Sequence, residues 1–304
     1  MRGRLIIFAL LATGLICVMP VIGQVPLDPE PYWISTELNQ YSTGIVWRDC
    51  NNDGYVDLFV SNGNDIVMAS NRVYMSHYGI LETTASWVSD NAEYTGHCSV
   101  GDVNDDGFPD FAVADYIGAY GFSTGNKSHI YLNDNGWLHT TPGWTAYDSI
   151  YTFSCAFGDA DGDGDLDLAF ATGEPYNNIL QNDRIYYNVD GQMQITPGWE
   201  SDQGTAALDV AWGDVDNNGY LDLAFGYGNG GLAVHYNYSG IIETAPSYMA
   251  NTSDLVNTLV FGDVDDDGWL DLIVAFNNQL GGDGYYRVYY NDGTGNLNID
   301  HGWQ

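Results

Sequence analysis

The sequence is poor in basic residues. Its 304 residues include 7 Lys and Arg against 41 Asp and Glu, which gives a formal net charge of -34. Nucleic acid and anionic membrane surfaces are bound by clustered cations, so this balance excludes both as partners. The scarcity of Lys, Arg and Glu beside 37 Gly and 23 Tyr disfavours long helices and favours short strands joined by tight turns. We therefore expect an all-β fold.

Long apolar runs are also missing after the N-terminus. Arg2 and Arg4 precede one apolar run, Leu5 to Met19, which is followed by small residues up to Gly23. This order is typical of a secretory signal peptide, and we expect residues 1–23 to be one. The run is shorter than the roughly 20 residues of a membrane-spanning helix. We therefore expect a protein that is secreted or held at the cell surface and has no membrane span.

Cysteine is scarce as well. Behind the predicted signal peptide only Cys50, Cys98 and Cys155 remain, too few for a disulfide scaffold. Cys98 and Cys155 each stand four residues before an acidic loop, so they occupy one position of a repeat. We expect two buried thiols on equivalent strands, and a disulfide between those strands is the alternative.

One nine-residue acidic pattern occurs five times, at residues 49–57, 102–110, 159–167, 214–222 and 263–271. The first residues of successive copies are 53, 57, 55 and 49 positions apart. An aromatic marker keeps the same phase, 15 residues before the second to fifth copies, at Trp87, Trp144, Trp199 and Tyr248. Two markers in one phase identify a true structural repeat.

Each repeat has room for four short strands. In the fourth repeat we expect them at Ala207–Trp212, Leu221–Tyr227, Leu232–Tyr238 and Ile241–Ala245. Four strands in about 50 residues are typical of one blade of a β-propeller. The sequence therefore predicts a β-propeller of four-stranded blades over residues 41–304, preceded by an N-terminal segment at 24–40.

The repeated loop has the composition of a Ca²⁺ site. Positions 1, 3, 5 and 9 are Asp or Asn in every copy, position 6 is Gly, and position 7 varies. Ca²⁺ is bound by such alternating side-chain oxygens together with a main-chain carbonyl, here at position 7, and the glycine allows a sharp turn. The predicted ligands are Asp49, Asn51, Asp53, Tyr55 and Asp57; Asp102, Asn104, Asp106, Phe108 and Asp110; Asp159, Asp161, Asp163, Asp165 and Asp167; Asp214, Asp216, Asn218, Tyr220 and Asp222; and Asp263, Asp265, Asp267, Trp269 and Asp271. We expect up to five Ca²⁺ ions.

These loops differ from EF-hand loops, which share the opening residues. An EF-hand closes with an acid at position 12, where this chain has Val or Phe. Here the closing Asp is at position 9 and a strand follows at once. Loops 3 and 5 offer four carboxylates each and the others three, so we expect unequal affinities.

The repeats resemble FG-GAP repeats of the VCBS type, the blades of the integrin α-subunit propeller. The matching pieces are FGDADGDGDLDLAF (Phe157–Phe170), WGDVDNNGYLDLAF (Trp212–Phe225) and FGDVDDDGWLDLIV (Phe261–Val274), and the resemblance covers about residues 33 to 303. It implies that Ca²⁺ binds in the loop joining the first two strands of each blade. It also implies seven blades, and Trp303 stands where the marker of a further repeat is due. We therefore expect a truncated seven-bladed ring, with a closed five-bladed ring as the alternative.

The resemblance implies a binding or adhesion module for an extracellular protein or a glycan. Its ligand face is expected opposite the calcium loops, on the long segments 116–126, 173–183 and 277–285, which are rich in Tyr, Asn and Gly. The candidate ligand residues are Tyr116, Tyr120, Phe122, Tyr176 and Asn178.

Catalytic side chains are sparse. Lys127 is the one lysine in the chain, and the six histidines are scattered without the spacing of a metal site or a nucleophile pair. We expect the protein not to be an enzyme. The alternative is the propeller domain of an extracellular lyase or hydrolase that degrades polysaccharides.

Overall fold

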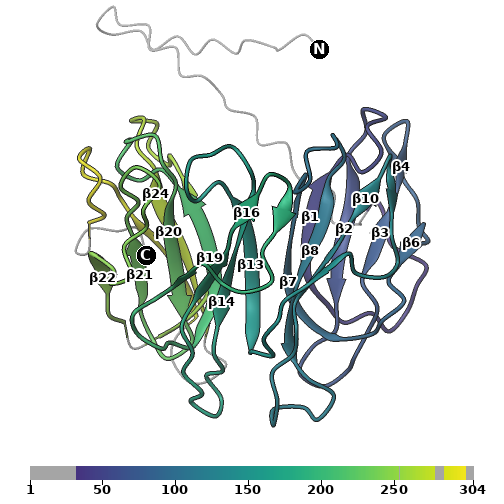
Figure 1. Cartoon of the computed structure of the whole chain (residues 1–304), viewed down its shortest axis with the longest axis horizontal. Helices are drawn as coiled ribbons and strands as arrows, with labels where there is room; N and C mark the ends of the chain where they lie inside the picture. Colours follow the sequence, from purple (N-terminus) through teal and green to yellow (C-terminus); the bar gives the residue numbers. More distant parts are fainter. Residues whose placement is uncertain (1–31, 253, 278–283, 299–304) are drawn as a thin grey trace, which may run out of the picture. The chain divides into compact units, whose positions relative to one another are not determined.

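A computed structural model describes residues 32–252, 254–277 and 284–298 (Figure 1). The regular elements in these ranges are all strands, β1 to β25, which lie in the unit Ser35–Gln304. The predicted signal peptide, residues 24–31 and Trp303 lie outside the described residues. The expected all-β fold is confirmed.

Five of the sheets contain three or four strands, and we number them as blades 1 to 5 in chain order. Blade 1 contains β1 (Ser42–Arg48), β2 (Asp57–Asn62), β3 (Arg72–Tyr74) and β6 (Trp87–Val88); blade 2 contains β7 (Tyr94–Gly101), β8 (Asp110–Ile117), β9 (His129–Tyr131) and β12 (Trp144–Thr145); blade 3 contains β13 (Thr152–Gly158), β14 (Asp167–Thr172), β15 (Arg184–Tyr186) and β18 (Trp199–Glu200); blade 4 contains β19 (Ala207–Gly213), β20 (Asp222–Tyr227), β21 (Leu232–His235) and β22 (Tyr248–Ala250); blade 5 contains β23 (Leu255–Gly262), β24 (Asp271–Asn277) and β25 (Tyr285–Tyr289). Two-stranded hairpins follow the third strands of blades 1 to 3, namely β4 (Ser76–His77) with β5 (Ile80–Leu81), β10 (Asn133–Asp134) with β11 (Trp137–Leu138), and β16 (Asn188–Val189) with β17 (Gln192–Met193).

The four strands of each complete blade pair antiparallel in chain order. The first two strands are joined through the acidic loop, whose closing Asp opens the second strand and pairs with the last residue of the first, as in Gly158 with Asp167. The second strands of blades 1 to 4 are buried along their length. Each of them lies inside its sheet, between the first and the third strand. Each acidic loop is therefore held by two strands of one sheet.

The fourth strand of blade 4 lies elsewhere than the sequence predicted. In blade 4 the segment Ile241–Ala245 makes one isolated bridge, from Ile242 to Asn237, and the outer strand is β22. The prediction of Ile241–Ala245 was therefore wrong. The aromatic markers open the outer strands, because the large side chain of a two- or three-residue strand anchors it in the apolar core between blades.

Neighbouring blades pack face to face, and each apolar cluster joins two of them. Between blades 1 and 2, for example, the rings of Phe59 and Phe111 lie 5.3 Å apart. Between blades 3 and 4, and between blades 4 and 5, a glycine at the end of the first strand lies under an aromatic ring of the following blade: a Cβ on Gly158 would lie 2.7 Å from Trp212, and one on Gly213 would lie 2.6 Å from Phe261. The blades thus follow one another in sequence order as an open ring of the propeller type.

The three described cysteines are free thiols. Cys98 and Cys155 lie at equivalent positions of β7 and β13, opposite Val113 and Phe170. Burial raises the pKa of Cys98 to about 11 and raises that of Cys155 as well. The raised pKa keeps both residues as neutral thiols, and the disulfide alternative is not formed.

Candidate functional site

Each acidic loop folds around its first aspartate. In loop 1 the carboxylate of Asp49 accepts the backbone N–H of Asp53 at 3.2 Å and that of Gly54 at 2.8 Å. The glycine at position 6 has a positive φ in all five loops, between 88° and 102°. Position 4 is also left-handed in every loop, and it is always Asn, Asp or Gly, residues that tolerate this conformation. The residue type at position 4 therefore indicates the loop conformation, and it does so independently of the residues at the predicted ligand positions.

The ninth residue of each loop is a buried carboxylate. In loop 3 Asp167 accepts the backbone N–H of Ala160 at 2.8 Å and that of Asn188 at 2.7 Å. Equivalent pairs of bonds hold the closing Asp of the other four loops. Burial raises the pKa of Asp167 to about 7, as it does for Asp110 and Asp222, although the two backbone hydrogen bonds oppose the shift. A cation at this position would relieve the cost of burying the charge.

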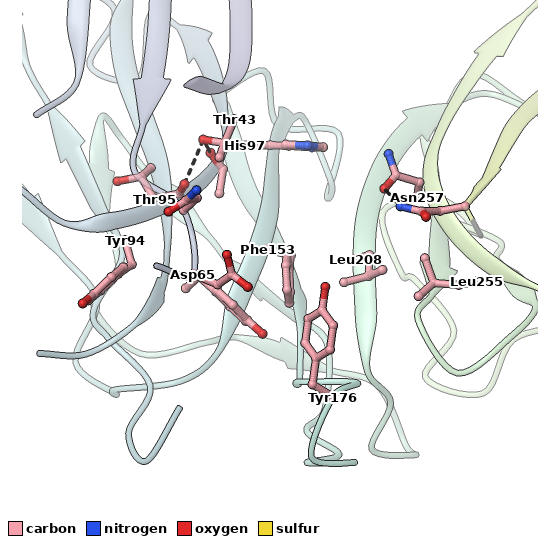
Figure 2. Close-up of a pocket in the computed structure, with 14 residues that line it drawn as sticks. Thr43, Asp65, Tyr94, Thr95, His97, Phe153, Tyr176, Leu208, Leu255 and Asn257 are labelled. Carbon is pink, nitrogen blue, oxygen red and sulfur yellow. Dashed lines mark hydrogen bonds between the residues drawn. The ribbon is translucent and has the colours of Figure 1, made fainter. Parts of the chain in front are cut away.

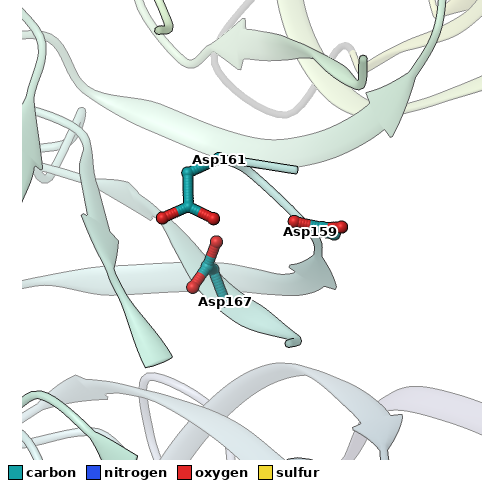
Figure 3. Close-up of side chains that lie close together, drawn as sticks. All are labelled: Asp159, Asp161 and Asp167. Atoms are coloured by element: carbon teal, nitrogen blue, oxygen red, sulfur yellow. The ribbon is translucent and has the colours of Figure 1, made fainter. Parts of the chain in front are cut away.

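Positions 1, 3 and 9 converge in loops 3, 4 and 5. Figure 3 shows Asp159, Asp161 and Asp167 directed toward one another, with one oxygen of each within 4.8 Å of the others. The same holds for Asp214, Asp216 and Asp222, and for Asp263, Asp265 and Asp271. In loops 1 and 2 position 3 is Asn51 or Asn104, so an amide oxygen takes the place of the third carboxylate. This donor set suits a hard divalent cation such as Ca²⁺.

A hydrogen bond links the fifth and seventh positions of each loop. The position-5 side chain accepts the backbone N–H of position 7, as from Asp165 to Asp163 at 2.9 Å, and loops 1, 2, 4 and 5 repeat this bond. This turn fixes the backbone around the position-7 carbonyl that the sequence predicts as a ligand. The position-7 side chains vary and supply no carboxylate to the converging groups of the described loops.

The loops also lie at the junctions between blades. An asparagine that follows the third strand of blades 2 to 5 donates its side-chain N–H to the carbonyl of loop position 2 in the preceding blade, as from Asn237 to Ala160 at 2.7 Å; the other pairs are Asn133 with Cys50, Asn188 with Val103, and Asn291 with Val215. In addition, Gly240, in the turn between Asn237 and Ile242 of blade 4, approaches Asp161 so closely that a Cβ would lie 2.2 Å from its carbonyl oxygen. Order in one loop is therefore coupled to the position of the next blade.

A second feature is a cavity of about 220 Å³ at the other end of the first strands (Figure 2). Its lining includes Thr43, Tyr94, Phe153, Leu208 and Leu255, which all stand at or next to the first residue of β1, β7, β13, β19 and β23. Because the acidic loops follow the last residues of these strands, the cavity and the loops occupy opposite ends of the blades. We call it the axial cavity.

The predicted ligand residues divide between this cavity and the surface. Tyr116 and Tyr176 line the cavity, and Phe122 joins them in one aromatic cluster, with its ring centroid 5.9 Å from each. Tyr116 is only 4% exposed, and its ring centroid lies 3.7 Å from that of Phe153. Tyr120 is 82% exposed, and Asn178 forms a turn with a φ of 54°; neither lines the cavity.

A polar cluster that begins at His97, a lining residue of the cavity, was not predicted from the sequence. His97 Nδ1 lies 3.4 Å from Asp209, which also accepts hydrogen bonds from the Thr258 hydroxyl at 2.6 Å and the Leu259 N–H at 2.9 Å. Burial acts to raise the pKa of Asp209, but the hydrogen bond and charge of His97, together with hydrogen bonds from Ser154 and Thr258, outweigh it and lower the pKa below its usual value. His97, Asp209 and Thr258 all stand five residues before an acidic loop, and this shared repeat position is a signal for their clustering.

A sequence profile described as "FG-GAP-like repeat" matches residues 49–113, 102–170 and 214–274, more than half of the chain. Each match begins at the first residue of one acidic loop and ends within the second strand of the next blade. No curated protein sequence matches the chain. The described residues contain no helix that is long and apolar enough to cross a membrane.

Among solved structures, the chain is similar to the crystal structure of the V. cholerae biofilm matrix protein Bap1, with a TM-score of 0.53 and 17% identity over 86% of this chain and 40% of that one. This chain therefore spans less than half of Bap1, and the likeness shows the fold alone. The chain is also similar to BBS1N in its complex with ARL6DN, with a TM-score of 0.48 and 12% identity over 88% of this chain and 83% of that one.

Proposed function

The chain belongs to the family of FG-GAP-like repeat proteins, and from this premise we propose that it is a Ca²⁺-stabilised binding module that works outside the cell. Ca²⁺ in the five acidic loops stiffens the blades, and the opposite end binds an extracellular protein or a glycan. The protein binds its ligand without catalysing a reaction on it. The predicted signal peptide and the acidic surface both favour the extracellular setting, where Ca²⁺ is abundant.

The observation that carries the proposal is the convergence of carboxylates in loops 3, 4 and 5. Three negative charges within 4.8 Å of one another repel in the absence of a cation, so the folded loops favour an ion that neutralises them. Asp161 and Asp216 are held there by the backbone of the loop, and the buried ninth residue completes each set. The cage is thus formed by the same hydrogen bonds that shape the loop.

Calorimetric titration of the Ca²⁺-free protein tests the first part of the proposal. Asp161→Ala is expected to remove one strong site, because it deletes one of the three converging carboxylates of loop 3. Asp165→Ala is the matched control, since this residue of the same loop contributes only its backbone to the predicted cage. Equal titrations of the wild type and both variants would contradict the proposed site.

A further inference from the structure

We propose that the axial cavity is a carbohydrate site that takes one neutral sugar residue, stacked on Tyr176 and hydrogen-bonded by Asp65 and Asn257. This inference rests on the proposed function and narrows it to one class of ligand and one place. The cavity of about 220 Å³ is large enough for a single pyranose ring and too small for a folded protein segment. The other residues of a longer glycan would extend out of the cavity.

Tyr176 is the stacking platform. It lies on the segment between β14 and β15, and 42% of it is exposed. Figure 2 shows its ring projecting into the cavity between Phe153 and Leu208. The edge-on contact with Phe122, at 71° between the ring planes, fixes its orientation. An ordered and partly exposed ring face matches the apolar C–H face of a sugar.

Polar groups on two walls match the hydroxyls of a sugar. Asp65 extends from the segment between β2 and β3, and Figure 2 shows its carboxylate directed toward the aromatic residues of the cavity. On the far wall Asn257 accepts a hydrogen bond from Asn277 at 2.9 Å, which fixes the orientation of its amide. A carboxylate accepts hydrogen bonds and an amide both accepts and donates, so together they serve hydroxyls in either role.

The charge of the cavity selects against acidic sugars. Among the described residues that line it there is no Lys or Arg, and Arg72 and Arg184 are paired with acids elsewhere, at Glu37 and Asp148. His97, the one lining histidine among the described residues, is engaged with Asp209. A uronate in this cavity would therefore place its carboxylate near Asp65 with no lining cation to balance it. A neutral sugar avoids this repulsion.

The same negative charge would attract a basic peptide, but the aromatic lining fits one poorly. A cation is held best by several aromatic faces at once, whereas Tyr116 and Phe153 are packed against each other and leave Tyr176 to present the open face. The geometry therefore favours a single stacked ring.

Calorimetric titration of the full Ca²⁺-saturated protein with N-acetylglucosamine, galactose, mannose and glucuronic acid tests the inference. At least one neutral sugar is expected to bind and glucuronic acid is not. Tyr176→Ala and Asp65→Ala are each expected to weaken binding at least tenfold. Tyr147→Ala is the control, because this tyrosine is 63% exposed and lies outside the cavity lining. Thermal unfolding of each variant checks that it is folded.

Three results would overturn the inference. One is that the folded, Ca²⁺-saturated protein binds none of the three neutral sugars, N-acetylglucosamine, galactose and mannose. Another is sugar binding that Tyr176→Ala leaves unchanged, and the third is preferred binding of glucuronic acid or of an oligoarginine peptide. In the second and third cases the protein still binds a ligand, so the broader proposal of a binding module stands. These results therefore separate a failure of the sugar site from a failure of the proposed function.

Discussion

Asp183 shows how one buried charge contributes to the pH dependence of this fold. Its carboxylate accepts hydrogen bonds from the Thr172 N–H at 2.9 Å and the Thr205 hydroxyl at 2.8 Å, and it is fully buried. Burial raises its pKa from 3.8 to about 7, against those hydrogen bonds. In blade 1 the neutral Asn71 holds the backbone of Asn62 in the same way, at 2.9 Å.

The comparison with Asn71 predicts the effect of Asp183→Asn. A carboxyl group whose pKa is raised on folding stabilises the protein below its unfolded pKa, and this contribution is lost as the pH rises through the folded pKa of about 7. At pH 8 the variant should therefore be more stable than the wild type, by up to about 4 kcal/mol, and the difference should disappear near pH 4. Denaturant unfolding at several pH values, with saturating Ca²⁺, measures it; a difference that does not change with pH would show that the buried charge has no such role.

At the scale of elements, the end of each first strand decides how blades dock. Gly158 and Gly262 hold the same repeat position, but a Cβ on Gly158 would lie 2.7 Å from the Trp212 ring, whereas one on Gly262 would have a single neighbour, Ile273 of its own blade, at 3.4 Å. The indole of Trp212 also donates to the Ala156 carbonyl at 3.0 Å. The contact with Trp212 thus leaves no room for a side chain at Gly158, whereas Gly262 has room for one.

This contrast predicts that Gly158→Ala destabilises the protein by about 1 to 3 kcal/mol, because the methyl group forces the indole off its contact. Gly262→Ala is the matched control and should be neutral or slightly stabilising, since alanine is favoured over glycine within a strand. Chemical denaturation of both variants decides the matter, and equal losses of stability would refute the role of the aromatic contact.

The elements that the sequence predicted are those repeated with a strong chemical pattern. The acidic loops and the strands that flank them recur with the same pattern in every repeat. The sequence from Asp159 to Phe170, for example, predicts both the loop and the start of the second strand. The outer strands are only two or three residues long, too short for an alternating pattern, and β22 was therefore misplaced at Ile241–Ala245. The contacts of the junction asparagines could not be predicted, because their partners are 76 to 85 residues away.

At the scale of the whole molecule, the axial cavity depends on contacts that one sequence does not reveal. His97 and Asp209 meet although they are 112 residues apart, and the cavity draws its lining from all five blades. The sequence could place Tyr116 and Tyr176 on the end opposite the loops, because alternate connections of a blade emerge on alternate ends. It could not show that one of these rings is buried and the other open.

The two ends of the blades are expected to serve separate purposes. Five Ca²⁺ ions would offset 10 of the 34 excess negative charges. The junction asparagines connect each loop to the following blade, so a loop ordered by Ca²⁺ would also stabilise the position of that blade. We therefore expect Ca²⁺ to support the axial cavity from the far end of the first strands without touching its ligand. We expect mutations in the loops to affect stability first and ligand binding second.

Calorimetric unfolding with saturating Ca²⁺ and with a chelator tests the central claim most directly, that the acidic loops are Ca²⁺ sites which hold the blades together. An ion at 100 times its dissociation constant adds about 2.7 kcal/mol for each site. For a chain of this size the five sites together predict a fall in Tm of at least about 10 °C when Ca²⁺ is removed. Mg²⁺ at the same concentration should restore little of it, because Mg²⁺ demands a tighter octahedral site. An identical Tm with Ca²⁺ and with the chelator would contradict the claim.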